Sequence, residues 1–160
     1  MATAYLDSVG FNRNEAGFPA MRGANRFSVM EITLDLAKID TERQAADLAR
    51  LGTGDSLRVL KIPAWALVLS AGFEVVEGLA SLTVALGDSA GATTLLAATA
   101  ASTDGALQLS TAGGAAIKGY NEENYLLATF AGAAPRSGKV RIFLTVADIK
   151  ADIGEVPGTV

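Results

Sequence analysis

Apolar residues alternate with polar residues over several stretches of the chain, which is the pattern of β-strands that bury one face. The clearest stretch is 139–149, and the region 28–36 shows the same period. Five further stretches are apolar, bounded by Gly, Pro or polar turns, and predict strands: 56–62, 66–77, 82–86, 107–110 and 125–130. In 139–149, the apolar set is Val140, Ile142, Leu144 and Val146, against Arg141, Phe143, Thr145 and Ala147; in 28–36 it is Met30, Ile32, Leu34 and Leu36.

Two stretches leave local questions. In 66–77, we expect one face to carry Leu67, Leu69, Ala71, Phe73 and Val75, with a bulge or bend at Gly72. Residues 93–103 fit either a short helix, because of the Leu and Ala residues, or a strand, because of the Thr residues at the edges.

The pattern predicts one helix, over 40–50. Asp40 and Thr41 are its possible N-caps, and the glycines at 52 and 54 end it. Short strands with one early helix predict a mainly β fold, an antiparallel β-sandwich or jelly-roll-like body. We expect three parts: an extended N-terminal arm over 1–26, the β body over 27–150 and a loosely ordered tail over 151–160.

The expected arm has no regular period but carries widely spaced rings at Tyr5, Phe11 and Phe18, with Arg13 and Met21 among them. Disordered tails contain few aromatic residues. We therefore favour an arm that docks on another surface, and a frayed terminus is the alternative.

Composition excludes several classes of partner. The net charge is −4 and Lys and Arg form no run, so we expect no nucleic-acid partner and no anionic membrane surface. The longest apolar stretch, 62–71, is shorter than the roughly 20 residues that span a bilayer, and the start does not resemble a signal peptide. A protein made in the cytosol is the expectation.

One motif suggests catalysis. Gly54, Asp55, Ser56 and Leu57 spell GDSL, the nucleophile motif of a family of lipases and esterases. That chemistry requires an imidazole base, and the chain contains no His. We interpret the motif as a Gly-Asp turn before a strand that begins at Ser56, and a second Gly-Asp-Ser at 87–89 in the same way. We therefore expect no enzyme activity.

Nor do the residues indicate a cofactor or metal. Cys and His, the preferred ligands of transition metals, are both absent, and no calcium loop or phosphate-binding glycine motif is present. Trp65 follows a Pro-Ala junction between strands, and Tyr120 and Tyr125 flank a polar turn. Packing is their first interpretation and contact with a partner the second.

The chain resembles a family of small virion structural proteins of tailed bacteriophages, which includes capsid decoration, or cement, proteins. Three segments carry the resemblance: SVGFNRNEAGF at 8–18, GDSLRVLKIPAWALVLSAGFEVV at 54–76 and GKVRIFLTVADI at 138–149. The resemblance implies a β-sandwich or jelly-roll body, often a homotrimer, on the outside of a shell of major capsid protein. It also implies synthesis in the host cytoplasm and a final location on the capsid surface of the virion.

We therefore expect a non-catalytic protein that binds a phage capsid and stabilises the shell. Two alternatives remain: another virion component (tail, head fibre or spike base), or a carbohydrate- or surface-binding β-sandwich module. The candidate interface residues are Tyr5, Phe11, Arg13, Phe18, Met21, Trp65, Tyr120 and Tyr125.

Overall fold

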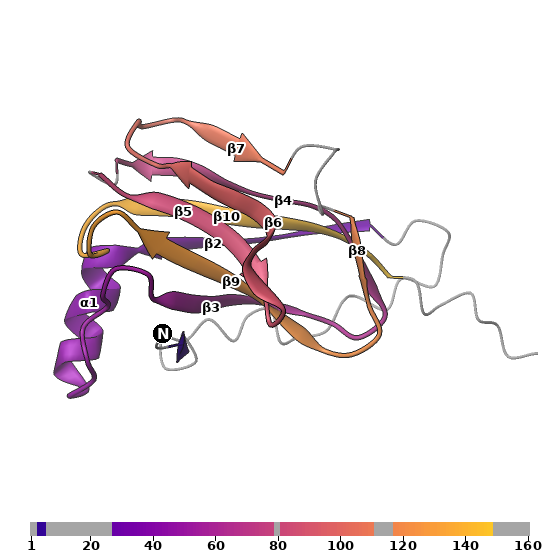
Figure 1. Cartoon of the computed structure of the whole chain (residues 1–160), viewed down its shortest axis with the longest axis horizontal. Coiled ribbons are helices and arrows are strands. Elements are labelled where there is room, and N and C mark those ends of the chain that lie inside the picture. The colour runs from indigo at the N-terminus through magenta and orange to yellow at the C-terminus, as the bar shows by residue number, and fades with distance from the viewer. Residues whose placement is uncertain (1–2, 6–26, 79–80, 111–116, 149–160) are drawn as a thin grey trace, which may run out of the picture.

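The chain forms two β-sheets that pack face to face, with a helix at one end (Figure 1). The computed structural model describes residues 3–5, 27–78, 81–110 and 117–148. Sheet A has the strand order β1-β3-β9-β5-β6 and sheet B the order β2-β10-β4-β7, with β8 also paired to β4. The predicted mainly β, sandwich-type body with one short helix is confirmed. The elements are β1 (Thr3–Tyr5), β2 (Phe27–Asp35), α1 (Leu36–Ala45), β3 (Ser56–Ile62), β4 (Ala66–Glu77), β5 (Thr83–Asp88), β6 (Gly91–Ala100), β7 (Leu107–Leu109), β8 (Lys118–Tyr120), β9 (Asn124–Ala131) and β10 (Lys139–Asp148).

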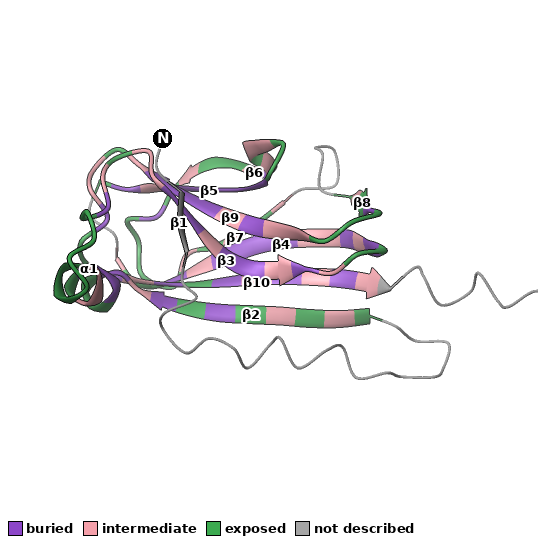
Figure 2. Cartoon of the chain, turned by 90° about the horizontal axis from the view of Figure 1, so that it is seen from below, coloured by how far each residue is buried: buried purple, intermediate pink, exposed green. Residues whose placement is uncertain are grey.

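The core lies between the sheets and receives alternate residues from β10 and from the second half of β2, and consecutive residues from β5 (Figure 2). Phe73 of sheet B and Phe130 of sheet A are the largest fully buried side chains. Burial of a side chain of this size stabilises the fold by about 1.5 to 3 kcal/mol. The apolar set predicted for 139–149 is fully buried, as the alternation requires: Val140, Ile142, Leu144 and Val146.

The predicted strands at 56–62, 66–77, 82–86, 107–110, 125–130 and 139–149 are present with small shifts at their ends. The ambiguous stretch 93–103 is mostly strand, because residues 93–100 belong to β6, which pairs with β5. β1 and β8, of three residues each, were not predicted.

The prediction for the faces of β4 was wrong in its first half. Ala66 and Val68 are buried there, whereas Leu67 and Leu69 are only half-buried. The register between β10 and β4 shifts between Thr145 and Val146, whose partners are Ser70 and Val68, so the extra residue at Leu69 reverses the faces. The bulge is therefore not at Gly72.

Gly72 has a different role. A Cβ at this position would lie 2.4 Å from the Gln108 carbonyl oxygen and 2.7 Å from the Phe143 ring. A glycine is needed here because β7 and the Phe143 ring approach the backbone closely.

The predicted helix boundaries were also wrong, since α1 begins four residues earlier. Asp35 is its N-cap, and its carboxylate accepts the Lys38 amide at 3.0 Å. This cap ends the strand before Leu36, which begins the helix. Asp40, predicted as a cap, is instead buried within the helix, where it pairs with Arg50. Ala46 is the C-cap of the helix.

Within the described residues, α1 is the only helix, and at ten residues it is too short to cross a membrane. Of the expected arm over 1–26, the structure describes only Thr3–Tyr5, which pair in parallel with β3. Residues 1–2 and 6–26 lie outside the described residues. The expected tail over 151–160 also lies outside them.

Candidate functional site

The serine of the GDSL motif occupies a buried position in sheet A. Ser56 is 3% exposed, and its hydroxyl shares a 2.6 Å hydrogen bond with the Thr129 hydroxyl. Asp55 accepts the Gly52 amide at 2.8 Å, and Gly54 has a φ of 86°, as in a tight turn. The interpretation of the motif as a turn before a strand is confirmed, because the Asp55 amide donates to the Gly52 carbonyl across the turn and β3 begins at Ser56.

A buried carboxylate joins the two sheets at the end of the sandwich opposite α1. Asp88 ends β5 and is 1% exposed. Its Oδ2 accepts the Tyr120 hydroxyl at 2.5 Å and the Lys118 ammonium at 2.6 Å, and its Oδ1 accepts the Ala90 amide at 2.8 Å. Lys118 and Tyr120 belong to β8, so this cluster ties the β5–β6 hairpin of sheet A to sheet B.

The surroundings set the charge of the cluster. Burial raises the pKa of Asp88, but the hydrogen bonds from Lys118, Tyr120 and the Ala90 amide outweigh it, so the pKa is lower than usual. Burial, and then the nearby Asp88 carboxylate, raise the pKa of Tyr120. The cluster is therefore an ionised Asp–Lys pair with a neutral tyrosine as a second donor.

The second Gly-Asp-Ser also precedes a turn, as predicted, but its aspartate is not a surface group. Sequence reasoning missed this cluster, since Asp88 precedes its partners by 30 and 32 residues. No local pattern links positions so far apart.

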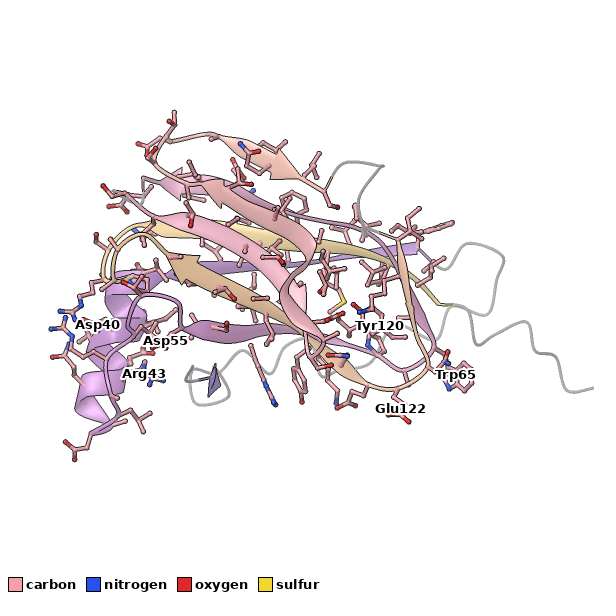
Figure 3. All side chains as sticks on the ribbon, viewed as in Figure 1. Asp40, Arg43, Asp55, Trp65, Tyr120 and Glu122 are labelled. Carbon is pink, nitrogen blue, oxygen red and sulfur yellow. The ribbon has the colours of Figure 1, made fainter. Side chains whose placement is uncertain are left out.

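The predicted interface aromatics differ in exposure. Trp65 is 37% exposed in the turn between β3 and β4, where its φ is 63°. Tyr125 is half-buried beneath the Arg58 guanidinium, 4.7 Å from the ring centre. Tyr120 is buried and bonded to Asp88, so it offers little surface to a partner. Trp65 and Tyr120 lie at the same end of the sandwich, together with Glu122 (Figure 3).

Of the other five candidates, the structure describes only Tyr5. Tyr5 belongs to β1 and pairs with Arg58 of β3 through the backbone. Phe11, Arg13, Phe18 and Met21 lie outside the described residues.

Sequence reasoning also missed a group of exposed apolar side chains on sheet B. Phe27 and Val29 of β2 are each 66% exposed, and Leu107 and Leu109 of β7 are 57% and 48% exposed. Phe27 and Val29 lie on the outer face, because the alternate residues of β2 point to the core. Leu107 and Leu109, at the opposite edge of the sheet, lie on the same face, because they pair with Glu74 and Gly72 and not with the buried Phe73. A signal existed: Val29 already lies on the face of 28–36 predicted to be polar, and extending the period back by one residue adds Phe27 to that face.

Both basic residues of β10 form ion pairs on sheet B. Lys139 contacts Glu77 at 3.1 Å and Asp35 at 3.7 Å, and Arg141 contacts Glu74 at 3.2 Å. In the part of the chain that the structure describes, no group of three or more acidic side chains could hold a metal ion.

Comparison with known proteins identifies the fold. No protein-family model matches the sequence, and no curated protein matches it significantly. Three solved structures match, all with probability 1.00. A chain in the capsid of Ralstonia phage GP4 is 16% identical over 92% of this chain and 98% of that chain, with a TM-score of 0.62.

The other two matches have similar titles. A chain in the capsid asymmetric unit of cyanophage Pam1 is 19% identical over 86% of this chain and 98% of that chain, with a TM-score of 0.55. A chain in the acidic stable capsid of Helicobacter pylori bacteriophage KHP30 is 11% identical over 77% of this chain and 88% of that chain, with a TM-score of 0.51. At these identities the likeness shows that the fold is shared.

Proposed function

We propose that this chain is a non-catalytic structural protein of a phage virion, a decoration or cement protein that binds the outside of the capsid and stabilises the shell. The observation that carries the proposal is the fold match to the chain in the Ralstonia phage GP4 capsid, which includes nearly all of both chains. The matches to chains in two further phage capsids support it.

Two properties favour a decoration role within the virion. The coverage means that the matched capsid chains are close to this sequence in length, so those capsids contain a small chain with this fold. Two of the segments that resemble decoration proteins, 54–76 and 138–149, include β3, β10 and all of β4 except Glu77, and so belong to the β body.

The energetics suit such a role. A rigid sandwich with exposed apolar side chains can make a modest contact with the major capsid protein, and repetition over a lattice makes many modest contacts effective together. Assembly as a homotrimer would give each trimer three such contacts with the shell. We propose synthesis in the host cytoplasm and a final location on the capsid surface, with no cofactor.

The test is binding to shell particles that lack this chain, assembled from the major capsid protein of the same phage. We expect saturable co-sedimentation, and decorated shells that withstand higher temperature than bare ones. Light scattering of the purified chain should give a trimer mass. Tails from the same phage are the control: binding to tails but not to shells would assign the chain to another part of the virion.

A further inference from the structure

The inference concerns the free edge of β2, the outermost strand of sheet B. Within the described residues, β2 pairs with β10 only. Asp35 lies opposite Lys139, and the Leu36 amide donates to the Gly138 carbonyl at 3.0 Å. This hydrogen bond shows which residues of β2 direct their backbone groups to β10. In an antiparallel ladder, alternate residues direct both backbone groups to the same neighbour. The even-numbered residues of β2 therefore bond β10, and the odd-numbered ones direct N–H and C=O to the free edge.

Within the described residues, this edge lacks three of the devices that normally prevent strand addition: proline, lysine and a bulge. Its nine pairs with β10 run without a register shift, whereas the ladder between β10 and β4 has two. The strand FSVMEITLD contains no Pro, Lys or Arg. Long, regular, apolar edges are sites where another strand pairs, unless proline, lysine or a bulge blocks them.

The side chains at the free positions define what a new strand would meet. Phe27, Val29, Glu31 and Thr33 are all exposed on the outer face. The first two are apolar, and Glu31 makes no ion pair within the described residues. An added strand would therefore be stabilised by apolar side chains opposite Phe27 and Val29 and by a basic side chain opposite Glu31.

We propose that the free edge of β2 binds an extended segment of a partner chain as an added strand of sheet B. This inference rests on the proposed function, which makes the partner the major capsid protein of the shell. Backbone hydrogen bonds at residues 27, 29, 31 and 33 supply affinity, and the side chains opposite Phe27, Val29 and Glu31 supply specificity.

Charge disfavours a second copy as the occupant. Two-fold pairing of β2 with itself over all nine residues is centred on Glu31, and it places the two Glu31 carboxylates directly opposite each other. Pairing centred on Met30 places them on a diagonal, which is still close. Each copy also carries a net charge of −4, so repulsion between whole chains adds to that between the two Glu31 carboxylates.

The test uses the full chain and the same shell particles, and compares proline at two free edges. Glu31→Pro removes an amide that faces away from β10 and blocks an incoming strand. Leu107→Pro is the matched control on β7. The Val75 amide donates to the Ala106 carbonyl, and the Ser110 amide donates to the Ala71 carbonyl, so the even-numbered residues of β7 bond β4. The Leu107 amide therefore also faces away from the sheet. Leu107 is 57% exposed.

We expect Glu31→Pro to weaken binding to shells by about tenfold or more and Leu107→Pro to leave it within about twofold. Glu31→Lys keeps the backbone and should weaken binding by about threefold, with a larger effect at low salt. Hydrogen exchange read by mass spectrometry should show segment 27–35 more protected in the unchanged chain on shells than free. This measurement and Glu31→Lys still test the edge if the proline variant does not fold.

Three outcomes would overturn the inference, and they are distinguishable. Equal binding by the unchanged chain and both Glu31 variants, without added protection of 27–35, would show that the chain binds shells through another surface. A dimer of the free chain that Glu31→Pro dissociates would make a second copy the occupant. Failure of the unchanged chain to bind shells would remove the proposed function and, with it, this partner.

Discussion

The Asp88 cluster and the β2 edge deal with polar groups in opposite ways. In the cluster, one buried carboxylate accepts the Ala90 amide, the Lys118 ammonium and the Tyr120 hydroxyl. At the edge, every second residue of β2 directs its backbone groups away from the only described neighbouring strand. The first arrangement satisfies donors and acceptors inside the chain, and the second leaves them for water or another strand.

The difference separates stability from assembly. A buried network that is fully satisfied fixes the positions of the elements it joins, here the β5–β6 hairpin and β8. An open edge contributes little to the stability of the single chain but offers a template to a partner. Changes at the cluster should therefore alter unfolding, and changes at the edge should alter binding.

The largest effect on unfolding is expected from Asp88→Ala. The change leaves the buried Tyr120 hydroxyl without its acceptor, and it removes the acceptor of the Ala90 amide and the partner of Lys118. We expect a loss of about 3 kcal/mol in the free energy of unfolding, measured by urea titration. Asp104→Ala is the control, because Asp104 is an exposed aspartate whose removal should change stability by less than about 0.5 kcal/mol.

If Asp88→Ala unfolded at the same urea concentration as the Asp104 control, the cluster would not hold the two sheets together. If it also abolished binding to shells while folded, the separation of stability from assembly would be wrong.

A smaller effect should appear as a dependence of stability on acid pH. The folded pKa of Asp88 is lowered from an unfolded value of about 3.9. Its contribution is therefore present above about pH 4 and is lost as the pH falls through the folded pKa, where the carboxylate binds a proton. Asp88→Asn should remove this part of the acid dependence, so its stability relative to the unchanged chain should improve as the pH falls.

Asp40 provides the comparison for this measurement. Its hydrogen bond with Arg50 lowers its pKa as well, so it contributes to the same loss of stability in acid. Urea titrations from pH 3 to pH 7 of Asp88→Asn, Asp40→Asn and the unchanged chain separate the two carboxylates. An acid dependence that Asp88→Asn leaves unchanged would contradict the role given to the cluster.

The sequence predicts the sandwich well where burial is periodic. In β10, one face is fully buried over its length, so Val140, Ile142 and Leu144 alternate clearly with outer residues. The prediction was wrong at Leu69, because a bulge inserts one residue without any sequence signature. It was wrong at Leu36, because this residue continues the strand period while the Asp35 cap already begins the helix.

The candidate site was less predictable than the fold. Contacts such as the one between Asp88 and Tyr120 depend on how distant strands meet, and neither residue has a local pattern that indicates its partner. The hydrogen-bonding phase of β2 depends on its register with β10, set by the Leu36–Gly138 bond. The alternation in β2 identifies the face of each side chain but not which backbone groups remain free.

The smallest effect on unfolding is expected at the exposed residues of β2. Phe27→Ser combined with Val29→Thr should change the free energy of unfolding by less than about 0.5 kcal/mol, because both side chains are 66% exposed. Ile32→Thr, on the opposite face of the same strand, is the control: Ile32 is 6% exposed, and the change should cost about 2 kcal/mol or more. The double variant should nevertheless bind shells more weakly, since it removes the apolar contacts that an added strand would make. A double variant as unstable as Ile32→Thr would place Phe27 and Val29 in the core of the single chain. The exposed residues of β2 would then stabilise the fold and would not be available to bind a partner.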